Sequence, residues 1–243
     1  MILALDTSSA AGSAAIARDG AVLVERAGDG SRHHGERLPR ELMDVLDAAG
    51  ATIRDVDLFA VCTGPGSYTG LRVGIATMQG LALAQRKPIV PVSAFDALTN
   101  LQPPTSNLQF PTSNLQPPAS SLRAVWIDAR RGEVFASLAG PDGRAIVPPS
   151  SLAPEATLAE WSEALKGSTR IRFAGDGAIR FADAIRAALG DRAELPADVP
   201  MLAATIARIA GANPDRAVAP PAVVPLYVRR TDVELARDRA AKG

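Results

Sequence analysis

The hydrophobic positions of the chain follow two different periods, and the order in which these periods occur is repeated. In the first part, alternating or continuous apolar runs predict strands, and an apolar residue every three or four positions predicts helices between them. The strands are expected at residues 1–6, 13–18, 21–26, 58–63 and 89–92. The helices are expected at residues 38–49, at residues 71–85 and directly after Ser93. The Asp19-Gly20 pair predicts a tight hairpin turn between the second and third strands.

The second part of the chain repeats this order. Strands are expected at residues 123–128, 133–138, 144–147 and 171–174. Helices are expected at residues 154–165, after the Gly175-Asp176-Gly177 turn, and from about residue 200 to residue 211. A duplicated mixed α/β unit predicts two similar lobes with a cleft between them.

A triple repeat separates the two parts. The segment reads NLQPPTS, NLQFPTS and NLQPPAS, and its prolines exclude a continuous helix. A polar, Pro-rich repeat is typical of an extended, solvated linker, which we expect to be disordered. We therefore divide the chain into a first lobe at residues 1–99, a linker at residues 100–121, and a smaller second lobe at residues 122–243.

The overall composition narrows the class of protein. The 243 residues include 26 basic and 26 acidic ones, so the net charge gives no general attraction to nucleic acid. Cys62 is the single cysteine, which excludes an internal disulfide and a cysteine-rich metal cluster. The opening MILALDTSSAAG predicts a strand rather than a signal peptide, and no apolar run approaches the ~20 residues of a membrane span. We expect a cytoplasmic globular protein without membrane contact.

An aspartate ends the first strand of each part. Asp6 lies in DTSSAAGS and Asp128 in DARRGEV. Phosphotransferases with two lobes hold Mg²⁺ between such a pair and wrap phosphates with the adjoining loops, which makes Asp6, Thr7, Ser8 and Asp128 candidates for nucleotide or anion binding. The alternative is that each aspartate hydrogen-bonds its own turn. Both interpretations remain open, although arginines stand at positions 130 and 131, where close approach to a phosphate favours glycine.

The glycine-rich string GPGSYTGLRVG follows a predicted strand and begins a helix. Gly64 and Gly66 would expose backbone N–H groups at the helix N-terminus, where an anion is favoured, and Gly175 and Gly177 form a similar turn in the second part. The alternative is that these glycines permit close packing. The string is neither a Walker loop nor a dinucleotide fingerprint. The two histidines are adjacent, at positions 33 and 34, and their spacing does not predict a metal site.

Several longer strings resemble the TsaB (YeaZ) family, whose members are needed for threonylcarbamoyladenosine beside the anticodon of tRNA. They are DTSSAAGSAAI, HHGERL, AVCTGPGSYTGLRVGIATMQGLAL, WIDARRGEV and PLYVRR. The resemblance extends over essentially the whole chain apart from the triple repeat. It implies the actin-like fold, also described as sugar kinase/Hsp70-like or ribonuclease H-like, with two duplicated α/β lobes.

The resemblance also implies that this chain is not the catalyst. The related TsaD carries a VNHxxxH-type metal motif, whereas residues 92–98 here read VSAFDAL, without either histidine. The expectation is a non-catalytic subunit with no catalytic residue, no metal and no cofactor of its own. It would support a TsaD homologue, with the ATPase TsaE as a further component. ATP or ADP would bind at the complex, and tRNA would be reached indirectly through it.

Members of the family pair through the first two helices of the first lobe, here residues 38–49 and 71–85. The residues expected to face a partner are Leu42, Met43, Leu46, Ile75, Met78 and Gln79. The partner would be the TsaD homologue or a second copy of this chain, and the alternative is that the leucines cover their own sheet. A rival hypothesis of another class is an independent ATP-dependent phosphotransferase or ATPase of the same fold.

Overall fold

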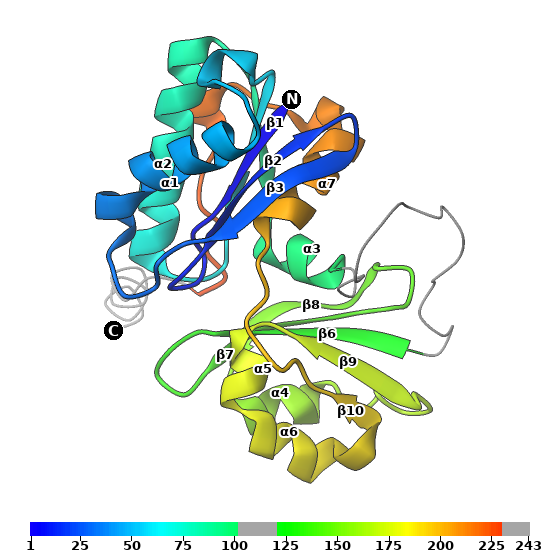
Figure 1. Cartoon of the computed structure of the whole chain (residues 1–243). Helices are drawn as coiled ribbons and strands as arrows, with labels where there is room; N and C mark the ends of the chain where they lie inside the picture. The colour runs from blue at the N-terminus through cyan, green and yellow to red at the C-terminus, as the bar shows by residue number, and fades with distance from the viewer. Residues whose placement is uncertain (102–120, 230–243) are drawn as a thin grey trace, which may run out of the picture.

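The computed structural model describes residues 1–101 and 121–229, which form two lobes, each built on a five-stranded sheet (Figure 1). Most of the expected linker, residues 102–120, lies outside the described residues, so its conformation stays a prediction. Within the described ranges, no helix is both long and apolar enough to cross a membrane.

The first sheet consists of β1 (Ile2–Asp6), β2 (Ser13–Arg18), β3 (Ala21–Ala27), β4 (Leu58–Cys62) and β5 (Ile89–Val92). Its strand order is β3-β2-β1-β4-β5, in which β1 is antiparallel to β2 and parallel to β4. The predicted hairpin turn joins β2 to β3, and both of its residues have positive φ, 51° at Asp19 and 81° at Gly20. This turn keeps the twist of the two strands continuous.

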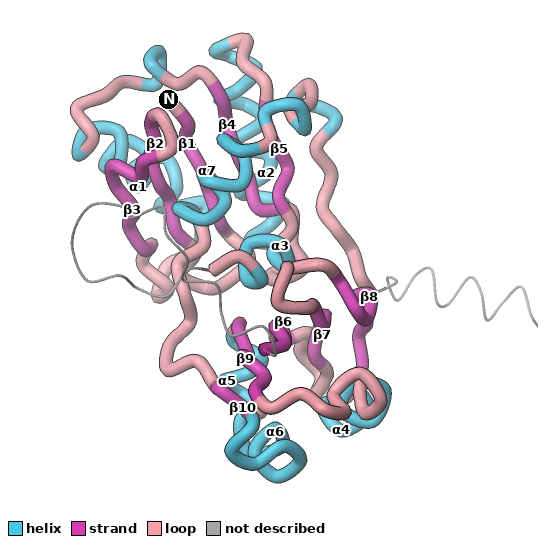
Figure 2. Tube along the Cα trace, turned by 90° about the vertical axis from the view of Figure 1, so that its right-hand side faces the viewer, coloured by secondary structure: helices cyan, strands magenta, loops and turns pink. Residues whose placement is uncertain are grey.

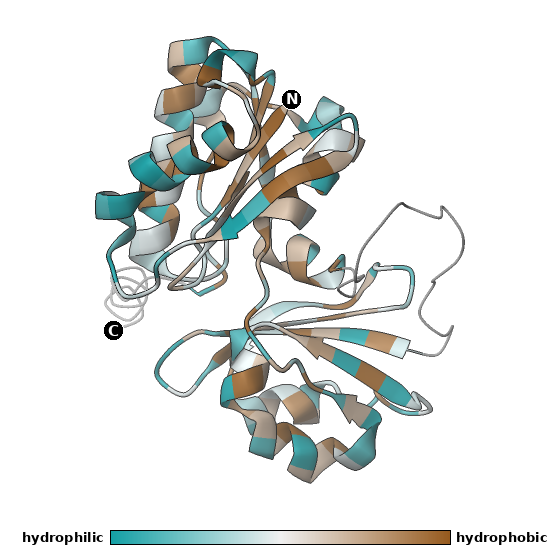
Figure 3. Ribbon diagram, viewed as in Figure 1, coloured by the Kyte–Doolittle hydropathy of each residue, from teal (hydrophilic) through white to brown (hydrophobic). Residues whose placement is uncertain are grey.

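Both faces of the first sheet are covered by helices (Figure 2). The helices are α1 (His34–Ala48), α2 (Tyr68–Gln85), α3 (Ala94–Thr99) and α7 (Ala203–Ala212). Successive residues of β1 face opposite sides, so Leu3 and Leu5 pack in one cluster with α1 and α2, while Ala4 packs in another with α3 and α7. In Figure 3 hydrophobic colour runs along strands of this sheet, and hydrophilic colour covers much of α1.

The second sheet repeats the first. Its strands are β6 (Ser121–Asp128), β7 (Val134–Ala139), β8 (Ala145–Leu152), β9 (Arg170–Ala174) and β10 (Ala193–Glu194). Its helices are α4 (Pro154–Glu160), α5 (Asp176–Arg180) and α6 (Ala182–Leu189). The order β10-β9-β6-β7-β8 matches that of the first sheet strand for strand, so the predicted duplication is confirmed. Trp126 anchors the core of this lobe, with ring centroids 6.1 Å from Trp161 and 5.6 Å from Phe173.

The C-terminal part of the chain returns to the first lobe. Helix α7 packs against β1 and β2, and its first N–H groups are bonded to side chains of the first lobe: Ser13 Oγ accepts from Ala203 N at 3.0 Å, and Glu25 Oε1 from Ala204 N at 2.7 Å. The observed second lobe therefore ends earlier than the expected range of 122–243. Amphipathic periodicity indicates that a helix has a buried face, but it does not identify the sheet that buries it.

Residues 213–229, which we call the C-terminal strap, follow α7 along the first lobe. Val218 and Ile89 exchange backbone hydrogen bonds of 3.1 and 2.9 Å, and Leu226 N donates to Thr63 O at 2.7 Å. The short 3₁₀ helices of the chain are η1 (Ile53–Asp55), η2 (Gly190–Arg192), η3 (Pro214–Arg216) and η4 (Pro220–Ala222), the last two within the strap. The strap thereby reaches the edge of the cleft.

Candidate functional site

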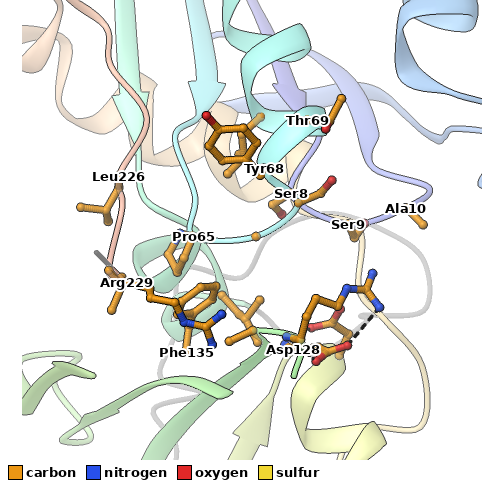
Figure 4. A pocket seen from close by; sticks show the side chains of 18 of the residues that line it. Ser8, Ser9, Ala10, Pro65, Tyr68, Thr69, Asp128, Phe135, Leu226 and Arg229 are labelled. Carbon is orange, nitrogen blue, oxygen red and sulfur yellow. Dashed lines mark hydrogen bonds and ion pairs between the residues drawn. The ribbon is translucent and has the colours of Figure 1, made fainter. Parts of the chain in front are cut away.

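A cavity of about 960 Å³ lies between the two lobes. The first lobe contributes residues 8–11 and 65–69, and the second contributes residues 127–131 with Phe135. Residues 226–229 of the strap line one side of it (Figure 4). Ligand pockets usually have volumes of roughly 300–1,000 Å³, so this cavity is the candidate site.

The glycines of the GPGSYTGLRVG string are explained by packing. A Cβ at Gly66 would meet Ser8, one at Gly70 would meet the main-chain oxygen of Thr7, and one at Gly74 would meet the Thr7 side chain. Gly64, with φ of 98°, would bring a Cβ within 2.6 Å of a Leu71 methyl group. The close-packing alternative therefore accounts for this string, and anion binding by Gly64 and Gly66 stays a prediction.

The corresponding turn of the second lobe behaves in the same way. A Cβ at Gly175 would collide with the main-chain oxygen of Trp126, and one at Gly177 would lie 2.9 Å from the same atom. Asp176, between them, accepts a hydrogen bond of 2.9 Å from Asp128 N. These glycines therefore hold α5 against the end of β6.

Asp6 is a buried carboxyl group. Its Oδ1 accepts a hydrogen bond of 2.8 Å from Ser8 N, and the residue is 1% exposed. Burial raises the pKa of Asp6 above its usual value, although the hydrogen bonds from Ser8 oppose this, and burial likewise raises the pKa of the neighbouring Cys62 thiol. Thr7 is also buried, and its Oγ1 has no hydrogen-bond partner among the described residues. Of these residues, Ser8 lines the large cavity.

Asp128 is held by arginines. Its Oδ1 accepts a hydrogen bond of 2.9 Å from Arg130 N, and its Oδ2 lies 3.2 Å from a guanidinium nitrogen of Arg130 and 3.2 Å from one of Arg180. Asp6 and Asp128 thus both bond the backbone two residues further along, which is the turn interpretation of the pair. A carboxylate shared by two guanidiniums is also a poor ligand for Mg²⁺, and no cluster of potential metal ligands occurs within residues 1–101 and 121–229.

The structure corrects most of the residues expected to face a partner. Leu42, Leu46, Ile75 and Met78 are 3%, 1%, 4% and 0% exposed and lie in the core between the helices and the first sheet. Gln79 binds the C-terminal strap, donating to Pro220 O at 2.8 Å. Met43 alone of the six is open, at 48% exposure. The C-terminal strap covers one side of α2, a contact that the sequence pattern did not predict. The apolar residues of α2 therefore pack inside the protein instead of facing a partner.

A clamp on the β1–β2 loop was not predicted. Arg37 is 3% exposed, and its guanidinium donates to Ala10 O at 2.9 Å and to Ala11 O at 2.6 Å. Glu41 accepts from the same guanidinium at 2.6 Å, and His34 Nε2 lies 3.1 Å from Ser9 O. Burial and the charge of Arg37 lower the pKa of His34. The signal was the i, i+4 spacing of Arg37 and Glu41, which begins within the HHGERL string.

An aromatic pair at the mouth of the cavity was also not predicted. The ring centroids of Tyr68 and Tyr227 are 5.7 Å apart, and Arg72 donates a hydrogen bond of 2.8 Å to the Tyr68 hydroxyl. Burial and the neighbouring Tyr68 raise the pKa of Tyr227. Two residues further on, Arg229 pairs with Glu133 of the second lobe. PLYVRR was noted as a motif, but its position in the cleft follows only from the fold.

Comparison with known proteins gives consistent matches. Residues 20–184 match the family model described as TsaD, tRNA N6-adenosine threonylcarbamoyltransferase. The chain is 39% identical over 92 residues to the tRNA threonylcarbamoyladenosine biosynthesis protein TsaB of Escherichia coli K12, covering 38% of this chain and 39% of that protein. It is 37% identical over 99 residues to TsaB of Haemophilus influenzae, covering 40% and 41%. These alignments thus span about two-fifths of the length of the curated relatives.

Solved structures match over nearly the whole chain. YeaZ from Pseudomonas aeruginosa has a TM-score of 0.71 at 26% identity, covering 93% of this chain and 98% of that one. A protein with similarity to peptidase YEAZ, also from Pseudomonas aeruginosa, has a TM-score of 0.70 at 28% identity, covering 94% and 99%. The activator of the 2-hydroxyisocaproyl-CoA dehydratase from Clostridium difficile, at a TM-score of 0.51, 13% identity and coverage of 93% and 99%, agrees in fold alone. The expected actin-like, two-lobed fold is confirmed.

Proposed function

This chain belongs to the TsaB/YeaZ family of TsaD-like proteins, and from that premise we propose that it takes part in forming threonylcarbamoyladenosine in tRNA. Its role would be that of a non-catalytic subunit that binds and supports a TsaD homologue. The observation that carries the proposal is the family match over residues 20–184 together with the structural match over nearly the whole chain.

The residues at the position of the TsaD metal motif support a non-catalytic role. Ser93 caps helix α3, its Oγ accepting from Asp96 N at 2.9 Å, and Ala94, Ala97 and Leu98 are buried. This segment offers no imidazole and performs a structural task instead. Metal analysis of the purified chain should therefore find far less than one equivalent of iron or zinc, and a stoichiometric, tightly held ion would contradict the proposal.

The partner would bind the outer side of α1 and α2, which lie side by side (Figure 1). Exposed large apolar side chains on these helices include Met43 of α1 at 48% and Leu83 of α2 at 52%. A Cβ at Gly80 would meet nothing within 4 Å, so the surface of α2 is open at this position. Contiguous exposed apolar surface marks interaction sites, and the two side chains would contribute to such a surface in the interface. The interface is thus proposed on the same helices as expected, but on residues that the structure leaves open.

The test is co-purification with a TsaD homologue, followed by measurement of modified adenosine in tRNA. Leu83→Asp and Met43→Asp should weaken the complex about tenfold or more, because an unpaired carboxylate in an interface is costly. The control is Ile146→Asp, at a side chain that is 49% exposed on β8 of the second lobe. If all three variants bind and support modification equally, the proposed interface is wrong.

The same surface would serve a homodimer, and sedimentation of the chain with and without the TsaD homologue distinguishes the two partners. The rival function, an independent ATP-dependent phosphotransferase, is supported by the size of the cavity. The two arginines on Asp128 oppose it. Participation of TsaE, and of ATP or ADP bound at the complex, stays a prediction, which reconstitution with and without each component tests.

A further inference from the structure

The mouth of the cavity carries an aromatic surface that the proposed partner interface does not use. Tyr68 and Tyr227, the two tyrosines of the chain, lie in contact and are 53% and 49% exposed. The guanidinium carbon of Arg72 is 5.3 Å from the centre of the Tyr68 ring. Open aromatic faces accompanied by arginine are surfaces on which unpaired nucleobases stack.

The part of the cavity wall that the second lobe contributes includes two arginines in a strained backbone conformation. Arg130 has φ of 61° and Arg131 φ of 54°, values that hairpin turns usually assign to asparagine or glycine. Left-handed backbone at non-glycine residues costs free energy and is concentrated at functional sites. The backbone conformation of the turn does not explain arginine at both positions, so we attribute these residues to a function of their side chains.

The chemistry of this wall favours direct contact with phosphate. Asp128 is already paired with Arg130 and Arg180, so it does not present a free carboxylate to a divalent cation. The Arg130 side chain remains 75% exposed. Guanidinium groups bind phosphate oxygens through directed, charge-assisted hydrogen bonds. An anion entering here meets arginine rather than a bound metal.

Resting on the proposed role in tRNA modification, we propose that the cavity mouth binds an unpaired nucleotide of RNA. Its base stacks on Tyr227, and its phosphate faces Arg130 and Arg131. The cavity volume of about 960 Å³ accommodates a nucleotide together with neighbouring backbone. Two features favour an RNA strand over a free nucleotide. The aromatic rings are open to solvent at the mouth, and Asp128 is paired with arginines and so is not free to hold the divalent cation that accompanies a free nucleotide.

The test is fluorescence anisotropy of a short, labelled single-stranded RNA with the full chain. Tyr227→Ala should weaken binding about tenfold, whereas Tyr227→Phe keeps the ring and should bind like the unchanged protein. Arg130→Gly removes a charge and also relieves the strained backbone. It should weaken RNA binding and make it less dependent on salt, while Arg180 still pairs with Asp128.

Two controls separate the alternatives. Arg144→Ala removes an arginine that is 90% exposed at the opposite end of β7, and it should leave RNA binding unchanged. Adenosine monophosphate should compete only weakly with the RNA. The proposal is overturned if Tyr227→Ala binds RNA normally, or if adenosine monophosphate competes as well as the RNA does. Leu83→Asp, the variant that tests the partner interface, should bind RNA normally. A loss of partner binding can therefore be distinguished from a loss of RNA binding.

Discussion

The side-chain amide of Gln79 donates a hydrogen bond of 3.0 Å to the main-chain oxygen of Val223, which lies 144 residues further along the chain. A second bond from the same nitrogen reaches Pro220 O at 2.8 Å. Gln79 was expected to face another protein, and it binds the chain's own strap instead. This contact fixes the strap on α2 just before it reaches the cleft.

Replacing Gln79 with alanine should loosen the strap. Two strap carbonyls lose their donor, which we expect to lower the free energy of unfolding by about 1–2 kcal/mol. Denaturant unfolding measures the loss, and hydrogen exchange at Leu226 N, which donates to Thr63 O, reports the strap itself. Unchanged exchange at Leu226 in the variant would show that the strap is held without Gln79.

Two methionines offer a matched test of burial. Met78 is 0% exposed and Met43 is 48% exposed. Met78→Asp places a carboxylate in the core and should cost ~3–5 kcal/mol of unfolding free energy, whereas Met43→Asp should change it by only ~0.5 kcal/mol. Urea melts of both variants check this. Similar melting of the two would mean that α2 does not pack as described.

Asp6 makes folding dependent on pH. Because burial raises its pKa in the folded protein, the folded state holds this proton more strongly than the unfolded chain does. The contribution of Asp6 is therefore most favourable at low pH and is lost as pH rises from the usual pKa of an aspartate through the raised one. Asp6→Asn removes this dependence and keeps an oxygen for Ser8 N.

The measurement for Asp6 is the difference in unfolding free energy between the unchanged protein and Asp6→Asn across pH. The difference should move in favour of the variant as pH rises. Glu25→Gln is the companion variant, because burial also raises the pKa of Glu25 while its Oε1 accepts from Ala204 N. A difference for Asp6→Asn that does not change with pH would contradict the assignment.

Arg37 and Arg40 form a matched pair on α1. Each has a carboxylate four residues further on, but the Arg37 side chain is 3% exposed and that of Arg40 is 84% exposed. Arg37→Ala should cost ~3 kcal/mol, because the carbonyls of the β1–β2 loop and Glu41 lose a buried cationic partner. Arg40→Ala should cost ~0.5 kcal/mol or less. Equal thermal unfolding of the two variants would refute the clamp.

The strands and the duplication were predictable because they depend on local hydrophobic pattern. The expected strand at residues 58–63, for example, is observed as Leu58–Cys62. Strand β8 was underestimated: residues 144–147 were expected and Ala145–Leu152 is observed, in spite of Pro148 and Pro149. Because β8 is an edge strand, a proline whose missing N–H would face away from the sheet is tolerated, and the pairing with β7 shifts register around Pro148 and Pro149.

The sequence predicted those features of the candidate site that depend on a single short segment of the chain. Asp6 and Asp128 were identified because each ends a strand at a hairpin. Both carboxylates hydrogen-bond the backbone of their own turns, which was one of the two interpretations of the pair. The pairing of Tyr68 with Tyr227 depends on the route of the strap across the first lobe. No periodicity within either segment encodes that route. The burial of Met78 was missed for the same reason, since the strap residue Val223 shares its apolar cluster.

The return of α7 to the first sheet has a consequence for the order of folding during protein synthesis. The strands of that sheet are complete at Val92, whereas α7 spans Ala203–Ala212. A ribosome adds about 5–20 residues per second, so the side of the sheet that carries Ala4 and Ala60 waits several seconds or more for α7. The whole second lobe emerges in that interval. The lobe that is translated first is therefore completed last.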